Sequence, residues 1–152
     1  MLPIRRVSPT ESALLAEFGG RLFWEAYQDI GDRVKLLSFI QEHYTAERFS
    51  EILSHPQTQA YLWEEECWKG YVMMEHGATF AEANTQALTK VNLLYLDRRW
   101  QGQGIGRQLL QHAEDKARDA GSEMLWLTVW PITPALAFYL KMGLHKIGEI
   151  PF

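Results

Sequence analysis

A glycine-rich stretch is the part of this sequence whose residue types and spacing are best suited to chemistry. It reads Tyr95-Leu-Asp-Arg-Arg-Trp-Gln-Gly-Gln-Gly-Ile-Gly-Arg107 and overlaps the end of an apolar run, Val91–Leu96. Glycine lets a ligand come close to the backbone, and the first turn of a helix presents unpaired N–H groups. A strand, this turn and a helix beginning near Gly104 would therefore form a cradle for a diphosphate group.

Two common nucleotide-binding patterns do not account for the turn. After Gly102 and Gly104, the dinucleotide fingerprint GxGxxG requires a third glycine where the chain has Arg107. The P-loop pattern GxxxxGK[ST] is absent from the sequence. Taken alone, the turn also fits an ordinary strand-to-helix connection, so the surrounding elements must decide between the two readings.

The hydrophobic pattern predicts the elements that position the turn. We expect helices over residues 10–27, 32–53 (in one or two pieces), 104–120 and 135–142. Strands are expected over residues 3–7, 58–66, 68–74, 88–96, 124–130 and 144–150, with a loop over 77–86. The order βααβββαβαβ predicts one α/β domain, residues 1–152, with a single mixed central sheet of about six strands.

Composition narrows the class of protein. A formal net charge of −4 and scattered Lys and Arg residues argue against a nucleic-acid partner. No apolar run approaches the ~20 residues that cross a bilayer, and no signal peptide is recognisable. Cys67 is the only cysteine and the five histidines lack paired spacing, so neither an internal disulfide nor a metal site is expected. These features predict a cytoplasmic protein without a membrane partner.

Two segments of the chain resemble the GNAT superfamily of N-acetyltransferases. Gln101-x-x-Gly104-x-Gly106 is similar to the family's acyl-CoA diphosphate loop, [Arg/Gln]-x-x-Gly-x-[Gly/Ala]. Ala135-Leu-Ala-Phe-Tyr-Leu-Lys-Met-Gly-Leu144 is similar to the family segment Ala-x-x-Phe-Tyr-x-Lys-x-Gly-Phe. An aromatic residue before the loop and a Leu-Leu pair after it extend the match. The resemblance implies a GNAT-like fold and acetyl-CoA as co-substrate.

The resemblance also implies how the chain would hold acetyl-CoA. Loop N–H groups bind the diphosphate, and the strand before the loop pairs its backbone with the pantetheine arm. An N–H group near Leu96 polarises the thioester carbonyl. The implied cofactor-binding residues are Leu94, Tyr95, Leu96, Gln101, Gly102, Gln103, Gly104, Ile105, Gly106, Arg107, Thr133 and Lys141.

Tyr139 matches the position of the family's usual general acid. A phenol of pKa ~10 stays protonated at neutral pH and can give its proton to the departing CoA thiolate. Packing beside its neighbour in the helix is the alternative role. Many relatives carry a Glu base where this chain has Lys90. Glu75, Glu82 and Asp97 remain candidates for a base acting through water, and each also fits a surface carboxylate.

Two departures from the family pattern concern the second half of the chain. The family often has an Asn that binds the pantetheine arm where this chain has Ile132, so the contact is lost or made by Thr133. The usual final strand is missing, because the chain stops at Phe152. Either the chain is truncated, or the sheet edge is open or completed by another molecule, for which a homodimer is expected.

The expected acceptor is the primary amine of a small molecule. Residues 22–27, 49–53 and 126–130 resemble bacterial polyamine acetyltransferases. Glu25, Asp29 and Asp32 would attract a polycation, although a solvated acidic loop explains them as well. The alternatives are a protein N-terminus, an amino acid or antibiotic amine, or a sensor or interaction module that binds acetyl-CoA without catalysis.

Overall fold

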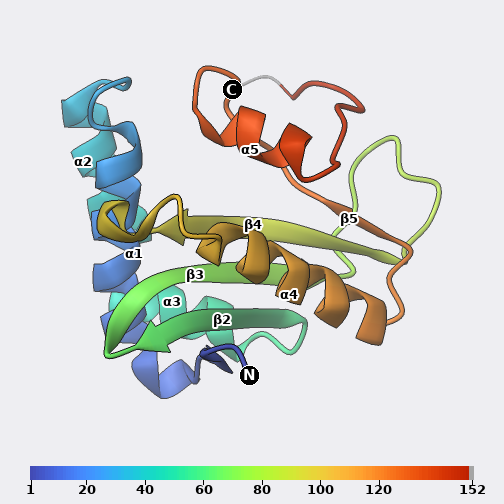
Figure 1. The fold of residues 1–152 in the computed structure, drawn as a ribbon, viewed down its shortest axis with the longest axis horizontal. Helices are drawn as coiled ribbons and strands as arrows, with labels where there is room; N and C mark the ends of the chain where they lie inside the picture. Colours follow the sequence, from blue (N-terminus) through green and yellow to red (C-terminus); the bar gives the residue numbers. More distant parts are fainter. Residues whose placement is uncertain (151–152) are drawn as a thin grey trace.

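A five-stranded sheet forms the central layer of the protein, and the computed structural model describes residues 1–150 (Figure 1). The strands lie in chain order; β1 to β4 pair antiparallel, and β5 is parallel to β4. A single mixed sheet confirms the predicted fold class. The strands are β1 Ile4–Arg6, β2 Thr58–Glu65, β3 Cys67–His76, β4 Leu88–Leu96 and β5 Met124–Trp126.

Helices cover both faces of the sheet. The region predicted as helical over residues 32–53 forms two helices, because Thr45 accepts a hydrogen bond from the Arg48 N–H and caps the second. Short 3₁₀ turns precede α1 and follow β4. The helices are η1 Pro9–Glu11, α1 Ser12–Tyr27, α2 Arg33–His43, α3 Ala46–Ser54, η2 Arg98–Trp100, α4 Ile105–Asp119 and α5 Ala135–Lys141.

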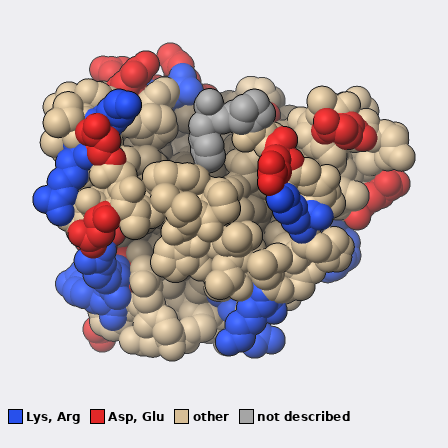
Figure 2. Space-filling model, turned by 90° about the horizontal axis from the view of Figure 1, so that it is seen from above, with Lys and Arg blue, Asp and Glu red and all other residues tan. Residues whose placement is uncertain are grey.

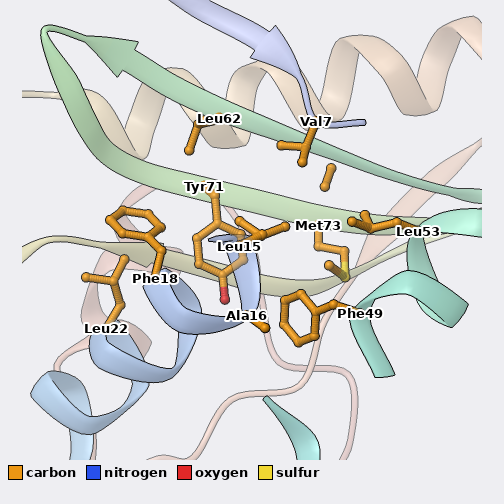
Figure 3. Packing of buried hydrophobic residues seen from close by; sticks show 11 residues of the cluster. Val7, Leu15, Ala16, Phe18, Leu22, Phe49, Leu53, Leu62, Tyr71 and Met73 are labelled. Atoms are coloured by element: carbon orange, nitrogen blue, oxygen red, sulfur yellow. The ribbon is translucent and has the colours of Figure 1, made fainter. Parts of the chain in front are cut away.

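The alternation of strand side chains divides the core into two clusters. Tyr71 and Met73 of β3 point to one face, where they pack with residues of α1 and α3 such as Leu15 and Phe49 (Figure 3). Val72, between them, belongs to the cluster under α4 on the other face. Because both faces are covered, the sheet is a rigid base for the loops at its ends.

The last predicted strand is wrong, and another is shorter than expected. Residues 144–150 form no strand, and the strand predicted over residues 124–130 ends at Trp126. Only three β5 residues pair with β4. The apolar residues Leu144, Ile147 and Ile150 recur at every third position, which does not line one face of a strand, and Ile147 and Ile150 remain 66% and 62% exposed. Within residues 1–150 the sheet therefore has five strands rather than about six.

None of the helices in the described part of the chain combines the length and apolar character required to cross a membrane.

A hydrogen-bonded chain joins the end of β3 to the start of β4 and to Ser122, two residues before β5. Nδ1 of His76 lies 2.8 Å from Oγ1 of Thr89, which lies 2.7 Å from Oγ of Ser122. His76 is 8% exposed, and its Nε2 is buried without a partner within residues 1–150. Burial, together with the charge of Arg6, lowers the pKa of His76. The folded protein therefore holds this imidazole in its neutral form.

We expect His76 to make the fold less stable in acid. Its pKa in the folded state lies below the unfolded value of about 6.5, so the unfolded chain binds more protons as the pH falls. The stabilising contribution is complete above that value and is lost as the pH falls through the lowered folded pKa. Urea midpoints measured from pH 7.5 to 5 should fall less steeply in His76→Gln than in the wild type. His145→Gln, at an exposed position, should keep the wild-type slope, and equal slopes in all three proteins would contradict the prediction.

Candidate active site

One edge of β4 is left open where β5 diverges from it. The two strands pair only from Leu88↔Met124 to Lys90↔Trp126. Beyond that point no strand within residues 1–150 pairs with the β5-facing edge of residues 91–96. The predicted contact residues Leu94, Tyr95 and Leu96 lie on this segment. An extended ligand can therefore bind along it through main-chain hydrogen bonds, as an added strand would.

A bulge in β4 lies at the start of the open segment. Met73 of β3 is opposite Leu93 and Met74 is opposite Val91, so Asn92 has no opposite residue on β3. A bulge bends a strand and changes the direction of the groups that follow it. The Asn92 side-chain amide donates to Glu75 Oε1 at 3.4 Å. The bulge was not predictable from the sequence, because the register of two strands is not visible in either strand alone.

The glycine-rich loop lies between the open strand and α4. Gly102 and Gly104 have φ angles of 80° and 84°, and a Cβ on either would meet no atom within 4 Å. These two residues thus combine a left-handed backbone with open space above it. The next residue, Ile105, begins α4, whose first N–H groups have no partner within the helix. Main-chain amides at such a helix start are suited to binding a diphosphate, and that role of the loop stays a prediction.

Gly106 places the start of α4 against both β4 and α5. A Cβ at this position would lie 3.2 Å from Leu96 Cδ1 and 3.4 Å from Phe138 Cζ. The helix start, the end of the open strand and the helix that carries Tyr139 are therefore in close contact. These three segments are separate in the sequence, and the fold brings them into contact.

Tyr139 lies beside an aromatic cluster at the end of α1. Burial, and then the nearby Tyr27, raise the pKa of Tyr139 to about 12. The Tyr27 and Tyr95 hydroxyls are 3.0 Å apart, and the Tyr27 and Trp130 ring centroids are 6.2 Å apart. Such a phenol is protonated at neutral pH and can donate a proton. The sequence analysis placed Tyr27 only at the end of a predicted helix, and its proximity to Tyr139 becomes visible in the fold.

Arg107 and Lys141 line one groove between α4 and α5. The groove has a volume of about 240 Å³, and Leu110, Gln111, Glu114 and Met142 complete its lining. Neither Tyr139 nor the open segment of β4 lines this groove. The groove is therefore suited to the part of a ligand that lies far from Tyr139. Thr133 is not among its lining residues. Thr133 is 8% exposed, and its hydroxyl donates a hydrogen bond to the Trp130 carbonyl at 2.8 Å.

The candidate bases differ in their surroundings. Glu75 is half-buried and accepts the bond from Asn92, whereas Glu82 is exposed in the loop after β3. Asp97 is 1% exposed and lies 2.9 Å from Arg99 and 3.1 Å from Arg21. The Arg99 side chain, with a smaller contribution from Arg21, holds the pKa of Asp97 well below its usual range. Asp97 is therefore not the surface carboxylate that the sequence left open, and its lowered pKa makes it a weak base.

The acidic residues near the end of α1 are already engaged. Glu25 pairs with Arg21 at 2.9 Å, and Asp29 lies 3.7 Å from Arg33. Asp32 caps α2. On the face shown in Figure 2, acidic and basic side chains adjoin one another around an uncharged middle. This region therefore offers less charge to a polycation than the sequence suggested.

No group of three or more potential His, Cys, Asp or Glu metal ligands occurs among residues 1–150.

The fold and the site together define a class of protein. The sequence model of the acetyltransferase (GNAT) domain matches residues 27–151. The chain belongs to this family, which confirms the family resemblance seen in the sequence; members of the family use acetyl-CoA as co-substrate.

Two curated relatives match shorter segments. An uncharacterized N-acetyltransferase in the pepI 3′ region of Lactobacillus delbrueckii subsp. lactis is 36% identical over 64 residues, which is 41% of this chain and 37% of that protein. Streptothricin acetyltransferase of Streptomyces lavendulae is 48% identical over 48 residues, 31% of this chain and 25% of that protein. The match thus spans well under half of each relative.

A solved structure matches nearly the whole chain. It is the PaiA N-acetyltransferase of Thermoplasma acidophilum in complex with coenzyme A, with a TM-score of 0.79 and 20% sequence identity. The match covers 93% of this chain and 87% of that one. At this identity the similarity establishes the shared fold.

Proposed function

We propose that this protein transfers the acetyl group of acetyl-CoA to the primary amine of a small molecule. The observation that carries the proposal is the open edge of β4 leading directly into the glycine loop, with Tyr139 close to the loop's helix. Acetyl-CoA supplies an activated thioester. The backbone of Leu94–Leu96 and the main-chain amides of residues 101–107 hold acetyl-CoA. These are the positions predicted from the sequence. The fold neighbour solved with coenzyme A supports this assignment.

The chemistry assigned to the chain is direct transfer. The amine nitrogen attacks the thioester carbonyl, a C–N bond forms, and the C–S bond breaks. Main-chain N–H groups near Leu96 stabilise the charge that develops on the carbonyl oxygen. Tyr139 gives its proton to the departing thiolate, and the proton lost by the amine passes to water or a side-chain base.

The acceptor is proposed only as a class of small-molecule amine. A polyamine remains the leading candidate from sequence, although Glu25 and Asp29 already face arginines. An antibiotic amine is the alternative suggested by the streptothricin acetyltransferase relative. An amino acid also stays within this class, and a protein N-terminus is the alternative outside it. A homodimer and a cytoplasmic location remain predictions.

The proposed activity is tested by measuring free thiol after incubation with acetyl-CoA and a panel of amines. The panel holds spermidine, an aminoglycoside, streptothricin, amino acids and a peptide with a free N-terminus. Thiol release above the amine-free rate with a small-molecule amine supports the proposal. Thermal stabilisation by acetyl-CoA with no release across the panel would instead establish a binding module.

Arg107 and Lys141 are proposed to bind the 3′-phosphate of the coenzyme in the α4–α5 groove. We expect Arg107→Gln with Lys141→Gln to weaken CoA binding by about tenfold, since an exposed ion pair contributes up to about 1 kcal/mol. Dephospho-CoA, which lacks that phosphate, should bind the wild type and the double variant with similar affinity. Calorimetry with both ligands checks this. Lys146→Gln, at an exposed lysine beyond α5, is the charge control, and equal losses for the two ligands would show that the cations act elsewhere.

A further inference from the structure

Asp97 connects two parts of the protein at the point where the chain leaves β4. Its Oδ1 accepts a hydrogen bond from the Arg99 N–H at 2.9 Å, which caps η2. Its Oδ2 lies 2.9 Å from Arg99 Nη2 and 3.1 Å from Arg21 Nη1 on α1. A nearly buried carboxylate bound by two guanidinium groups is a strong, directional anchor.

Residues of β3 also contact the junction at Asp97, where the chain leaves β4. The Asp97 N–H donates to the Lys69 carbonyl at 2.8 Å. Lys69 is 9% exposed, its Nζ lies 4.0 Å from the centroid of the Trp100 ring, and it pairs with Glu65 at 3.1 Å. A cation over the face of an indole is attracted to it. Trp100 ends η2 and directly precedes the glycine loop, so β3 and Asp97 together fix where the loop begins.

The junction is also tied to the helix that reaches the acyl end of the site. The Arg98 N–H donates to Glu25 Oε1 at 3.3 Å, and the Arg98 guanidinium donates to the Glu25 carbonyl. Two residues later α1 ends at Tyr27, whose hydroxyl bonds that of Tyr95. The start of the cofactor loop and the aromatic cluster beside Tyr139 are therefore attached to the same helix.

We propose that Asp97 is a positioning residue: its carboxylate fixes the direction in which the chain leaves β4, and so places the loop amides relative to the thioester along Leu94–Leu96. The inference rests on the proposed function. Loop amides act on a diphosphate only when they point at it, and small misplacements of a bound substrate are costly in rate. The low exposure of Asp97 and its paired arginines distinguish this role from that of a base acting through water.

The direct test is the affinity for CoA, measured by calorimetry for the wild type, Asp97→Asn and Asp115→Asn. We expect Asp97→Asn to weaken CoA binding by about tenfold or more, because charge-assisted bonds that orient the loop are lost. Asp115→Asn makes the same charge change at an exposed ion pair with Arg118 on α4, and should stay within about twofold of the wild type. Lys69→Met, which keeps an apolar side chain on Trp100, should also weaken CoA binding. This variant replaces Asp97→Asn in the test if Asp97→Asn does not fold.

Two further readouts separate positioning from the other roles. With the amine that gives the fastest thiol release, Asp97→Asn should raise the KM for acetyl-CoA and leave the pH profile of kcat unchanged. Wild-type CoA affinity in folded Asp97→Asn overturns the proposal, as does a changed pH profile with unchanged CoA affinity, which would identify a base. If the wild type binds CoA but acetylates no amine, the proposed function fails while the affinity comparison still decides the role of Asp97.

Discussion

Replacing Tyr139 with phenylalanine should lower kcat by about 100-fold to 10,000-fold, the range expected for loss of a general acid. The side chain keeps its volume, so packing against Phe138 persists and the affinity for CoA should stay within about twofold. Without the phenol, CoA leaves as a free thiolate. Steady-state thiol release and calorimetry with CoA check the two expectations separately.

The pH dependence adds a second expectation for Tyr139. Burial raises its pKa to about 12, so the phenol keeps its proton, and its capacity as an acid, throughout the neutral and mildly alkaline range. Any loss of kcat below about pH 10 must then come from another group. Tyr61→Phe, at a buried hydroxyl of β2 that bonds Gln59, is the matched control and should leave kcat unchanged. Wild-type kcat in Tyr139→Phe would assign Tyr139 to packing alone.

Replacing Gly104 with valine should abolish measurable CoA binding, with a loss of affinity of about 100-fold or more. A β-branched residue is strained at a φ of 84°, at a cost of roughly 1–2 kcal/mol. Its side chain would also fill the open space above the loop, where the diphosphate is proposed to lie. Calorimetry with CoA measures the loss, and urea denaturation measures the strain.

Gly121→Val separates these two effects. Gly121 has a φ of 83° and equally open surroundings, and it follows the last turn of the same helix. The substitution should therefore destabilise the fold by a similar amount and leave CoA affinity intact. If both variants lost CoA binding equally, strain in α4 rather than obstruction of the loop would be responsible.

Local signals in the sequence predicted much of the fold. Helical spacing and a terminal glycine placed α4, and Gly121 has the left-handed conformation expected of it. β4 was predicted with the bounds that the structure has, although Thr89, Lys90 and Asn92 interrupt its apolar residues. The strand predicted over residues 144–150 was wrong: its apolar residues recur at every third position, and no strand within residues 1–150 pairs with it. Pairing is a tertiary property that periodicity alone does not reveal.

The candidate site was predictable where a motif carries the chemistry, and not where the fold assembles it. The glycine loop and Tyr139 follow from spacing within short segments. The contact of Tyr27 with Tyr95 joins residues 68 positions apart, and no local pattern indicates it. Asp97 was considered as a base because its residue type allows it. Its burial between Arg21 and Arg99 depends on how α1 packs beside β4, which becomes visible only in three dimensions.

The unpaired edge of β4 has a consequence for the lifetime of the protein in a cell. A ligand that bonds to that edge binds the native state and has no counterpart in the unfolded chain. It therefore adds about 2.7 kcal/mol to the free energy of unfolding when its concentration is 100 times its Kd. Resistance to heat and to proteolysis would then rise with the cellular concentration of acetyl-CoA. The protein would be degraded faster when that concentration is low.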